Sequence, residues 1–262
     1  MQQNDVTLDG RTDSLRPLAG QVALLTRADE GVGMATATAL ARCGANLALT
    51  LLDTEVEPAL LDELRGIGCK VVVFRAPTDS SSTQHTQLVR QVMAEFGRID
   101  VLVANSEYRV QWQVDDDDLD EDQVEFQYSM NVKSNIALIR AVIRVMTDGG
   151  RVIALGSSLA DRVGTPGLAD FAATRAALAA FCKGAAHDLG PRGISINVVQ
   201  MGAIAFDAVA VSPDIIESER ASTALKRLGR PSEVASAITF LAGPSASFIT
   251  GSVLNVDGGY NA

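Results

Sequence analysis

Residues 26–33, with the sequence TRADEGVG, have the composition of a turn that could hold phosphate. They follow an apolar run and precede an alanine-rich stretch that is typical of a helix. In a dinucleotide-binding fold the pyrophosphate lies at the N-terminus of such a helix, where backbone N–H groups are free. The glycines there let backbone and ligand approach closely. The candidate cofactor-binding residues of this turn are Thr26, Gly31, Val32 and Gly33.

Acidic and bulky residues in and near the same turn argue against a bound dinucleotide. Arg27 stands where the first glycine is usual, and a Cβ there costs about 1–2 kcal/mol if the position requires positive φ. A carboxylate of Asp29 or Glu30 about 4 Å from a phosphate would be repelled by up to about 4 kcal/mol at an effective dielectric near 20. The second expected strand ends in leucines, with Asp53 placed late for a ribose hydroxyl. We therefore expect no bound NAD(P).

Short apolar or β-branched runs alternate with helical patterns along the chain. The expected strands cover residues 22–26, 46–52, 70–74, 100–105, 151–157, 194–199 and 252–256. The expected helices cover residues 32–43, 56–68, 84–97, 121–146, 168–189 and 232–241. Apolar strands separated by helices are typical of a parallel sheet covered on both faces. We expect one Rossmann-like doubly wound α/β domain of seven mostly parallel strands over residues 18–262, preceded by a flexible arm over residues 1–17.

The composition limits the classes of partner. The net charge of −10 argues against nucleic acid and anionic membranes. No apolar run reaches the roughly 18–20 residues that cross a bilayer, so we expect a cytoplasmic protein. Three scattered cysteines and two histidines predict neither disulfides nor a metal site. The acidic run at residues 115–122 is interpreted as a solvated loop leading into a helix, because its carboxylates lack the spacing of a calcium loop.

From about residue 18 onward the sequence resembles the short-chain dehydrogenase/reductase family, particularly its members similar to 3-oxoacyl-carrier-protein reductase. TRADEGVG aligns with the family's T-G-x-x-x-G-x-G, and DVLVANSE aligns with D-V-L-V-N-N-A-G. MNVKSN, ALGSS, ADFAATRAALAAF and ISINVVQMG align with further catalytic and cofactor segments, and the tail from residue 230 is close throughout. The resemblance implies the fold and, for ordinary members, NAD(P)-dependent oxidation or reduction.

Four residues occupy the family's catalytic positions by this resemblance. Asn131 and Ser158 match the family's asparagine and serine, whereas Phe171 and Arg175 replace its tyrosine and lysine. The family's tyrosine donates a proton to the substrate oxygen, and phenylalanine has none to donate. General acid catalysis is typically worth about 10²- to 10⁴-fold. Arginine keeps the positive charge of lysine but not its compact shape. We predict that these four positions are non-functional in hydride transfer.

Other family contacts with the cofactor differ as well. Asn105 is retained, but Glu107 replaces a glycine two residues later. Met201 replaces a proline, and Phe206 replaces a threonine that holds the nicotinamide amide. Counted as independent changes, these departures predict a vestigial cofactor site that is not occupied.

The resemblance therefore suggests a pseudoenzyme. We predict a non-catalytic structural or regulatory subunit that assembles with an active paralogue, for instance a hydroxyacyl-CoA or hydroxyacyl-carrier-protein dehydrogenase, or that forms a homodimer or homotetramer. The apolar helices at residues 121–146 and 168–189 and the tail from residue 230 correspond to segments through which the family usually associates.

Two alternatives stay open. One is an atypical NAD(P)-dependent oxidoreductase of a carbonyl or alcohol, in which Tyr108 or Tyr128 substitutes as proton donor. The other is a small-ligand-binding protein that uses the vacated pocket. A halohydrin dehalogenase, which shares the fold and uses an arginine, is disfavoured because it also needs the tyrosine that Phe171 replaces.

Overall fold

A computed structural model describes residues 16–29, 31–51, 58–205 and 213–262. Residues 1–15 of the expected flexible arm, residues 1–17, lie outside the described residues. Among the described residues, no helix has the length and apolar character needed to span a bilayer.

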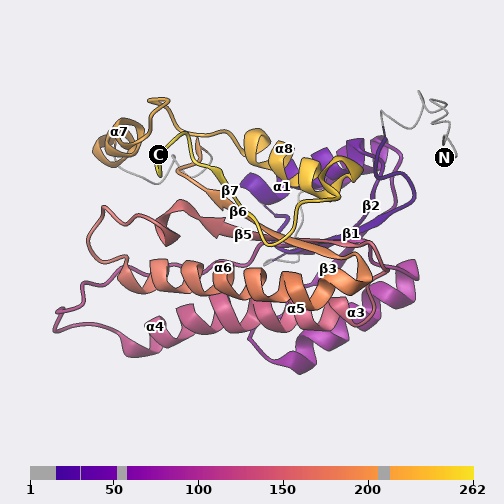
Figure 1. The fold of residues 1–262 in the computed structure, drawn as a ribbon, viewed down its shortest axis with the longest axis horizontal. Helices are drawn as coiled ribbons and strands as arrows, with labels where there is room; N and C mark the ends of the chain where they lie inside the picture. Colours follow the sequence, from indigo (N-terminus) through magenta and orange to yellow (C-terminus); the bar gives the residue numbers. More distant parts are fainter. Residues whose placement is uncertain (1–15, 30, 52–57, 206–212) are drawn as a thin grey trace, which may run out of the picture.

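One seven-stranded parallel sheet forms the centre of the molecule, which confirms the predicted fold class (Figure 1). The strand order is β3-β2-β1-β4-β5-β6-β7, and every neighbouring pair is parallel. The strands are β1 (Val22–Leu25), β2 (Asn46–Leu51), β3 (Val71–Arg75), β4 (Val101–Ala104), β5 (Arg151–Ser157), β6 (Ser195–Met201) and β7 (Val253–Val256). The strand order runs outward in opposite directions from β1 and β4, so the topological switch point lies between these two strands. Ligands of such sheets bind at the carboxyl ends of the strands at this point.

Helices cover both faces of the sheet. They are α1 (Gly31–Arg42), α2 (Pro58–Gly66), α3 (Ser82–Phe96), α4 (Glu121–Tyr128), α5 (Asn135–Ile143), α6 (Ala169–Leu189), α7 (Pro213–Ser222) and α8 (Pro231–Ala242). Figure 1 shows α1 and α8 on one face and α3, α5 and α6 on the other. Each face has its own core of buried aliphatic side chains, because strands covered on both sides bury every residue. The short polar helix α7 was not predicted from the sequence.

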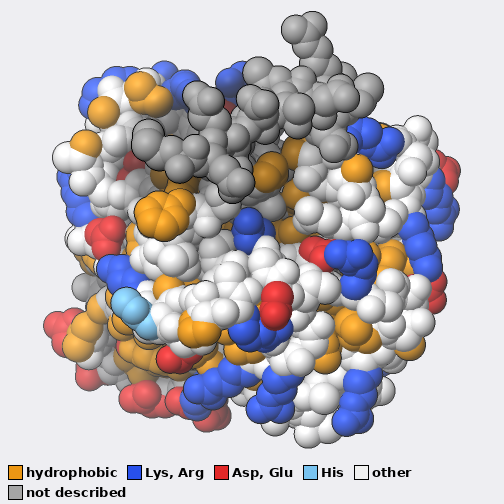
Figure 2. Space-filling view, turned by 45° about the vertical axis from the view of Figure 1, so that its right-hand side comes forward, with side chains coloured by type: hydrophobic (Ala, Val, Ile, Leu, Met, Phe, Trp, Pro, Cys, Tyr) orange, Lys and Arg blue, Asp and Glu red, His pale blue; other side chains and the backbone are white. Residues whose placement is uncertain are grey.

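The helix expected over residues 121–146 is divided by a π-helical segment, Ser129–Ser134. Asp120 caps the N-terminus of α4 by accepting a hydrogen bond from the Gln123 N–H at 3.1 Å. The acidic run before it is a loop leading into a helix, as interpreted from the sequence. Figure 2 shows acidic side chains gathered at the lower left of the face drawn. A π-helical segment within an α-helix often marks a functional site, and this π-helical segment contains Asn131.

Asp100 joins the amino ends of three strands. Its carboxylate accepts hydrogen bonds from the Val22 N–H at 2.9 Å and the Thr147 hydroxyl at 2.7 Å. Its backbone oxygen accepts from the Arg151 N–H, which begins β5. Burial raises the pKa of Asp100, but hydrogen bonds from Arg98, Val22 and Thr147 outweigh burial, so the pKa lies below its ordinary value of 3.8. The folded sheet therefore favours the ionised form of the Asp100 carboxylate.

Asp100→Asn should lower the free energy of unfolding at pH 7 by about 2–4 kcal/mol, because it removes the charge that these donors surround. A lowered folded-state pKa stabilises the fold above the ordinary value of 3.8, and this stabilisation is lost as pH falls through the folded-state pKa. Urea unfolding at pH 7 and at acid pH measures both effects. Asp148→Asn, at an exposed ion pair with Arg192, is the control. An equal loss in both variants would contradict this role.

Candidate functional site

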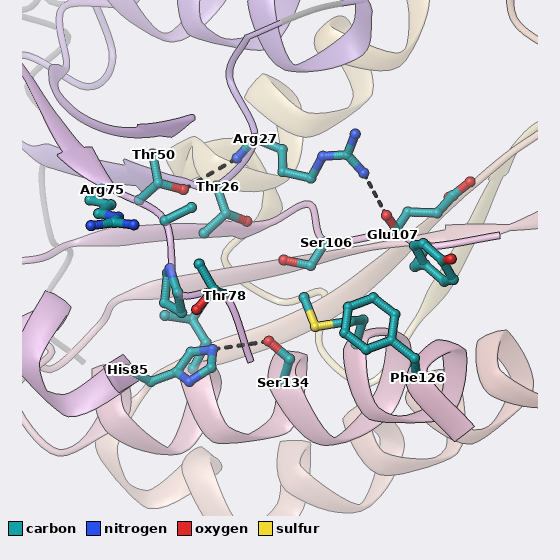
Figure 3. Close-up of a pocket in the computed structure, with 15 residues that line it drawn as sticks. Thr26, Arg27, Thr50, Arg75, Thr78, His85, Ser106, Glu107, Phe126 and Ser134 are labelled. Atoms are coloured by element: carbon teal, nitrogen blue, oxygen red, sulfur yellow. Dashed lines mark hydrogen bonds between the residues drawn. The ribbon is translucent and has the colours of Figure 1, made fainter. Parts of the chain in front are cut away.

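A cavity of about 670 Å³ opens at the carboxyl ends of β1 to β4, where a doubly wound sheet binds its ligand (Figure 3). Its size is within the range of small-molecule sites. It is lined by Thr26, Arg27, Thr50, Arg75, Ala76, Pro77, Thr78, His85, Ser106, Glu107, Tyr108, Phe126, Met130, Ser134 and Leu138.

The predicted glycine turn forms one wall of this cavity. Arg27 has φ of 50°, so the strained left-handed conformation that was considered from the sequence is present. A Cβ on Gly33 would lie 2.0 Å from the Arg27 carbonyl oxygen, so only glycine permits this approach. Asn105 joins the turn to the end of β4, because its N–H donates to Thr26 Oγ1 at 2.8 Å and its Nδ2 donates to the Arg27 oxygen at 3.1 Å. Gly31 begins α1.

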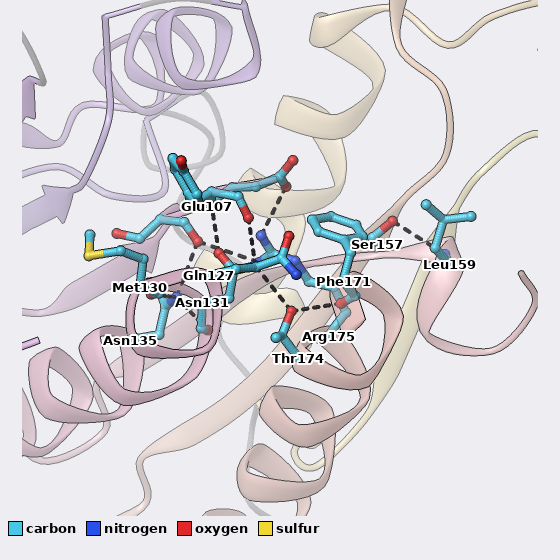
Figure 4. A network of polar contacts seen from close by, with 12 residues as sticks. Glu107, Gln127, Met130, Asn131, Asn135, Ser157, Leu159, Phe171, Thr174 and Arg175 are labelled. Atoms are coloured by element: carbon cyan, nitrogen blue, oxygen red, sulfur yellow. Dashed lines mark hydrogen bonds and ion pairs between the residues drawn. The ribbon is translucent and has the colours of Figure 1, made fainter. Parts of the chain in front are cut away.

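Three residues that depart from the family pattern form one charged cluster. Arg175 is buried with 1% of its side chain exposed, and its Nη2 lies 3.2 Å from Glu107 Oε2 (Figure 4). The Arg27 guanidinium donates to the Glu107 backbone oxygen at 2.5 Å. Burial lowers the pKa of Arg175, Glu107 raises it, and the nearby charge of Arg27 lowers it. Glu107 therefore contacts both arginines, Arg175 through its carboxylate and Arg27 through its backbone oxygen.

The contact between Arg175 and Glu107 is an ion pair without hydrogen-bond alignment. The Nε and Nη2 atoms of Arg175 are buried and have no aligned acceptor among the described residues. Its Nη1 donates to the Ser106 oxygen at 3.4 Å. The attraction between the charges, rather than directed hydrogen bonding, holds Glu107 at this place.

Phe171 lies between two cations. The guanidinium carbon of Arg175 is 4.9 Å from the centre of its ring, and that of Arg109 is 5.5 Å away. Guanidinium groups at such distances are attracted to the face of an aromatic ring.

Ser158 is buried and directly follows β5. The short helical turn that begins there is capped by Ser157, whose side chain accepts a hydrogen bond from the Leu159 N–H.

Asn131 fixes the loop after β4. Its Oδ1 accepts from the Tyr108 N–H at 2.7 Å, and its Nδ2 donates to the Tyr108 oxygen at 2.8 Å. The same Nδ2 donates to the Thr174 hydroxyl, which in turn donates to the Phe171 oxygen at 2.6 Å (Figure 4). Asn131 thus connects Tyr108 to the first turns of α6.

The two tyrosines considered as substitute donors differ in their surroundings. Tyr108 lines the cavity, packs edge-on against Phe126, and its hydroxyl makes no hydrogen bond with any described residue. The Tyr128 hydroxyl donates to Asp170 Oδ1 at 3.0 Å and lies outside the cavity lining. Burial and the Asp170 carboxylate raise the pKa of Tyr128.

Sequence reasoning did not identify Arg75, His85 or Ser134 as site residues. His85 Nε2 lies 3.0 Å from Ser134 Oγ, and its Nδ1 lies 2.7 Å from the Ser81 oxygen. Burial lowers the pKa of His85, so the neutral ring with Nδ1 protonated fits these partners. The place of Arg75 at the end of an expected strand was the signal that could have found it.

Known proteins resemble this chain over nearly its whole length. The family described as enoyl-(acyl carrier protein) reductase matches residues 27–261. The 3-oxoacyl-[acyl-carrier-protein] reductase FabG of Escherichia coli K12 is 35% identical over 92% of this chain and 97% of its own. This chain belongs to the short-chain dehydrogenase/reductase family.

Other relatives differ in the activity or ligand that their names state. Cyclohexanol dehydrogenase of Rhodococcus sp. TK6 is 30% identical over 95% of this chain and 98% of its own. The cyclic-di-GMP-binding biofilm dispersal mediator protein of E. coli K12 is 32% identical over 93% of this chain and 98% of its own. Among solved structures, a short-chain dehydrogenase/reductase from Serratia marcescens has a TM-score of 0.89 and 33% identity, covering 94% of this chain and 100% of that one. One from Burkholderia cenocepacia in complex with NADP has a TM-score of 0.87, with the same identity and coverage.

These comparisons correct two predictions. The non-catalytic subunit is wrong, because full-length relatives are named reductases and dehydrogenases. The absence of a cofactor is not supported either, because similar structures hold NADP or NADPH. Both predictions depended on counting each departure from the family pattern as an independent loss. Arg27 and Arg175 both contact Glu107, so these three departures are linked.

The residues present fit the adenosine half of a dinucleotide. The cavity lies at the required strand ends, and Gly33 leaves room for the close approach of α1 to the turn. The Oδ1 atom of Asp29 is buried with no hydrogen-bond donor among the described residues. A ribose hydroxyl is a donor that such an acceptor needs, so this carboxylate need not face a phosphate. Glu30 and Asp53 lie outside the described residues.

Glu107→Gln should destabilise the protein by about 1–3 kcal/mol, because it leaves the buried Arg175 charge unpaired. The side chain of Glu107 is partly exposed, and solvent screening therefore keeps the loss below that of a fully buried pair. In an Arg175→Met background the same change should cost much less, because no buried charge remains. Urea unfolding of the four proteins measures this coupling. Glu125→Gln, which removes an exposed ion pair with Lys133, is the control. Equal costs in both backgrounds would show that Glu107 does not balance Arg175.

Proposed function

We propose that this chain is an NAD(P)-dependent oxidoreductase that interconverts a carbonyl and an alcohol, with a proton donor other than a tyrosine at position 171. The cavity at the carboxyl ends of β1 to β4, with its glycine cradle, carries this proposal. The similarity to a named reductase and a named dehydrogenase supports it. The bound nicotinamide would supply or accept the hydride, and the protein must move one proton at the substrate oxygen.

The turn and the loop after β4 would hold the cofactor. Gly33 allows α1 to pack closely against the backbone of the turn at Arg27, and the N–H groups at the start of this helix suit a pyrophosphate. Asn105 fixes the turn against β4 through Thr26 and Arg27. The proposed cofactor-binding residues are Thr26, Gly31, Val32, Gly33 and Asn105.

Tyr108 is the proposed proton donor. Tyr108 lines the cavity, and its hydroxyl has no hydrogen-bond partner among the described residues, whereas the Tyr128 hydroxyl donates to Asp170. Asn131 holds both backbone polar groups of Tyr108, so it acts as a positioning residue. The next residue, Arg109, lies over the Phe171 ring, which places this loop beside the family's tyrosine position. Ser158 is proposed to position the substrate oxygen, as its family counterpart does.

Tyr108→Phe should lower kcat by about 10²- to 10⁴-fold, because it removes the proton while keeping the ring against Phe126. Tyr128→Phe is the matched control and should stay near the wild type. The assay follows NADH and NADPH oxidation with a panel of ketones, aldehydes and 3-oxoacyl thioesters. Full turnover by Tyr108→Phe would remove this residue from the mechanism. Failure of the wild type to bind either dinucleotide would overturn the proposed function itself.

We also propose that the protein forms homo-oligomers in the cytoplasm. Phe248 is fully exposed and Phe240, on α8, has 45% of its surface exposed, and aromatic side chains are enriched in protein interfaces. The three cysteines are unpaired, as in a reducing compartment.

Phe240→Ser/Phe248→Ser should therefore yield a smaller particle, because the change removes apolar contact area. Light scattering after size exclusion measures the mass, and Phe126→Ser, at another exposed phenylalanine, is the comparison. An unchanged mass for Phe240→Ser/Phe248→Ser would exclude this surface as the interface.

A further inference from the structure

Two arginines lie next to the family's serine and tyrosine positions. Arg109, in the loop after β4, has its guanidinium carbon 5.5 Å from the centre of the Phe171 ring. Arg162, in the turn after Ser158, has its guanidinium carbon 4.8 Å from the centre of the Tyr260 ring. Both arginines are exposed, and each is held by attraction to an aromatic face. Solvent-accessible cations therefore stand on both sides of the place proposed for the substrate oxygen.

The backbone at Arg109 is fixed on both sides. The N–H of Tyr108 donates to Asn131 Oδ1 at 2.7 Å, and the N–H of Val110 donates to Gln127 Oε1 at 2.8 Å. Both of these amide side chains are fully buried. A charged group whose position is fixed before binding loses less conformational entropy when a ligand arrives.

The C-terminal segment fixes Arg162 in a comparable way. The Arg162 N–H donates to the Ser158 oxygen at 3.3 Å, and Asn261 Nδ2 donates to the same oxygen at 3.0 Å. The Arg162 guanidinium donates to the Tyr260 oxygen at 2.6 Å. This arginine is thus tied both to the turn that carries Ser158 and to the end of the chain.

The segments that carry the two arginines are joined to each other. Gln111 Nε2 donates to the Pro166 oxygen at 2.8 Å, and the Trp112 N–H donates to the Gly167 oxygen at 3.1 Å. Gly167 has φ of 82°, and a Cβ there would lie 2.8 Å from Gln111 Cγ, so glycine permits this approach. The loop after β4 and the turn after β5 therefore form one connected edge of the site.

Neither Arg109 nor Arg162 makes an ion pair with a described residue, although the chain carries −10. The exposed carboxylates of residues 115–118 act through solvent, where salt screens them, whereas a bound carboxylate would contact a guanidinium directly. The other acids of these segments accept hydrogen bonds from other groups: Asp161 from Gln200, Asp170 from Tyr128, and Asp257 from the N–H groups of Gly259 and Asn261.

We infer that Arg109, assisted by Arg162, binds a carboxylate of the substrate, so that the protein acts on oxoacids in preference to uncharged ketones. This inference rests on the proposed function, because it names the substrate class of the same site. A planar guanidinium matches the two oxygens of a carboxylate. The two arginines determine specificity, and the proton still comes from Tyr108.

Steady-state kinetics on the full chain compare 2-oxobutanoate and 3-oxobutanoate with their methyl esters, using NADH and NADPH. We expect at least one acid to have a kcat/KM about 10- to 100-fold above that of its ester. Arg109→Gln should remove most of this preference, chiefly by raising KM for the acid. Arg109→Lys, which keeps the charge, should retain part of it. Arg144→Gln removes an exposed arginine that caps the end of α5 and should leave the preference unchanged.

A binding measurement gives a readout that does not need turnover. Trp112, the chain's single tryptophan, lies in the same loop as Arg109, so its fluorescence should change when an oxoacid binds. We expect a saturable change with the acids and little with the esters, and we expect its loss in Arg109→Gln/Arg162→Gln. Thermal unfolding of each variant checks that it is folded.

The outcomes separate this inference from the proposed function. If uncharged ketones or the esters are turned over as well as the acids, or if Arg109→Gln weakens acid and ester equally, the role of Arg109 is overturned and the oxidoreductase proposal stands. If neither dinucleotide binds but the acids still change the fluorescence in a manner that depends on Arg109, the carboxylate site stands and the proposed function fails. If neither the dinucleotides nor the acids bind, both proposals fail.

Discussion

The buried guanidinium of Arg175 sets the arrangement of the site. A charge that is removed from water must be paired, because an isolated ion in the interior costs several kcal/mol. Glu107 supplies the opposite charge, and its backbone oxygen receives the Arg27 guanidinium. The glycine turn, the loop after β4 and α6 are thereby joined. Glu107 is the residue that both contacts share.

The fold was predictable because burial leaves a regular trace in the sequence. The seven runs of apolar residues mark strands that are covered on both faces, and the longer amphipathic patterns mark their helices. The division of the helix expected at residues 121–146 was not predictable. The side chain of Asn135 donates to the oxygens of Met130, Asn131 and Ser106, and such contacts depend on the tertiary structure.

The positions of the site were found from the sequence, but their interpretation was not. A sequence shows each substitution separately, so Arg27, Glu107 and Arg175 were counted as three losses. The structure brings Arg27 and Arg175, which lie 80 and 68 positions from Glu107 in the sequence, into contact with that residue. Arg75 carries no motif, and only the register of β3 with β2 shows that it lies beside the other strand ends at the cavity. Substitution at familiar positions is therefore weak evidence that activity is lost.

The packing of α1 against α8 has a consequence for biosynthesis. The two helices share the core on one face of the sheet, although one lies near the start of the domain and the other near residue 240. As the chain emerges from the ribosome, α1 and the early strands expose an aliphatic surface that only a much later segment can cover. Contacts of such long sequence separation form slowly, and the nascent chain is aggregation-prone in the interval.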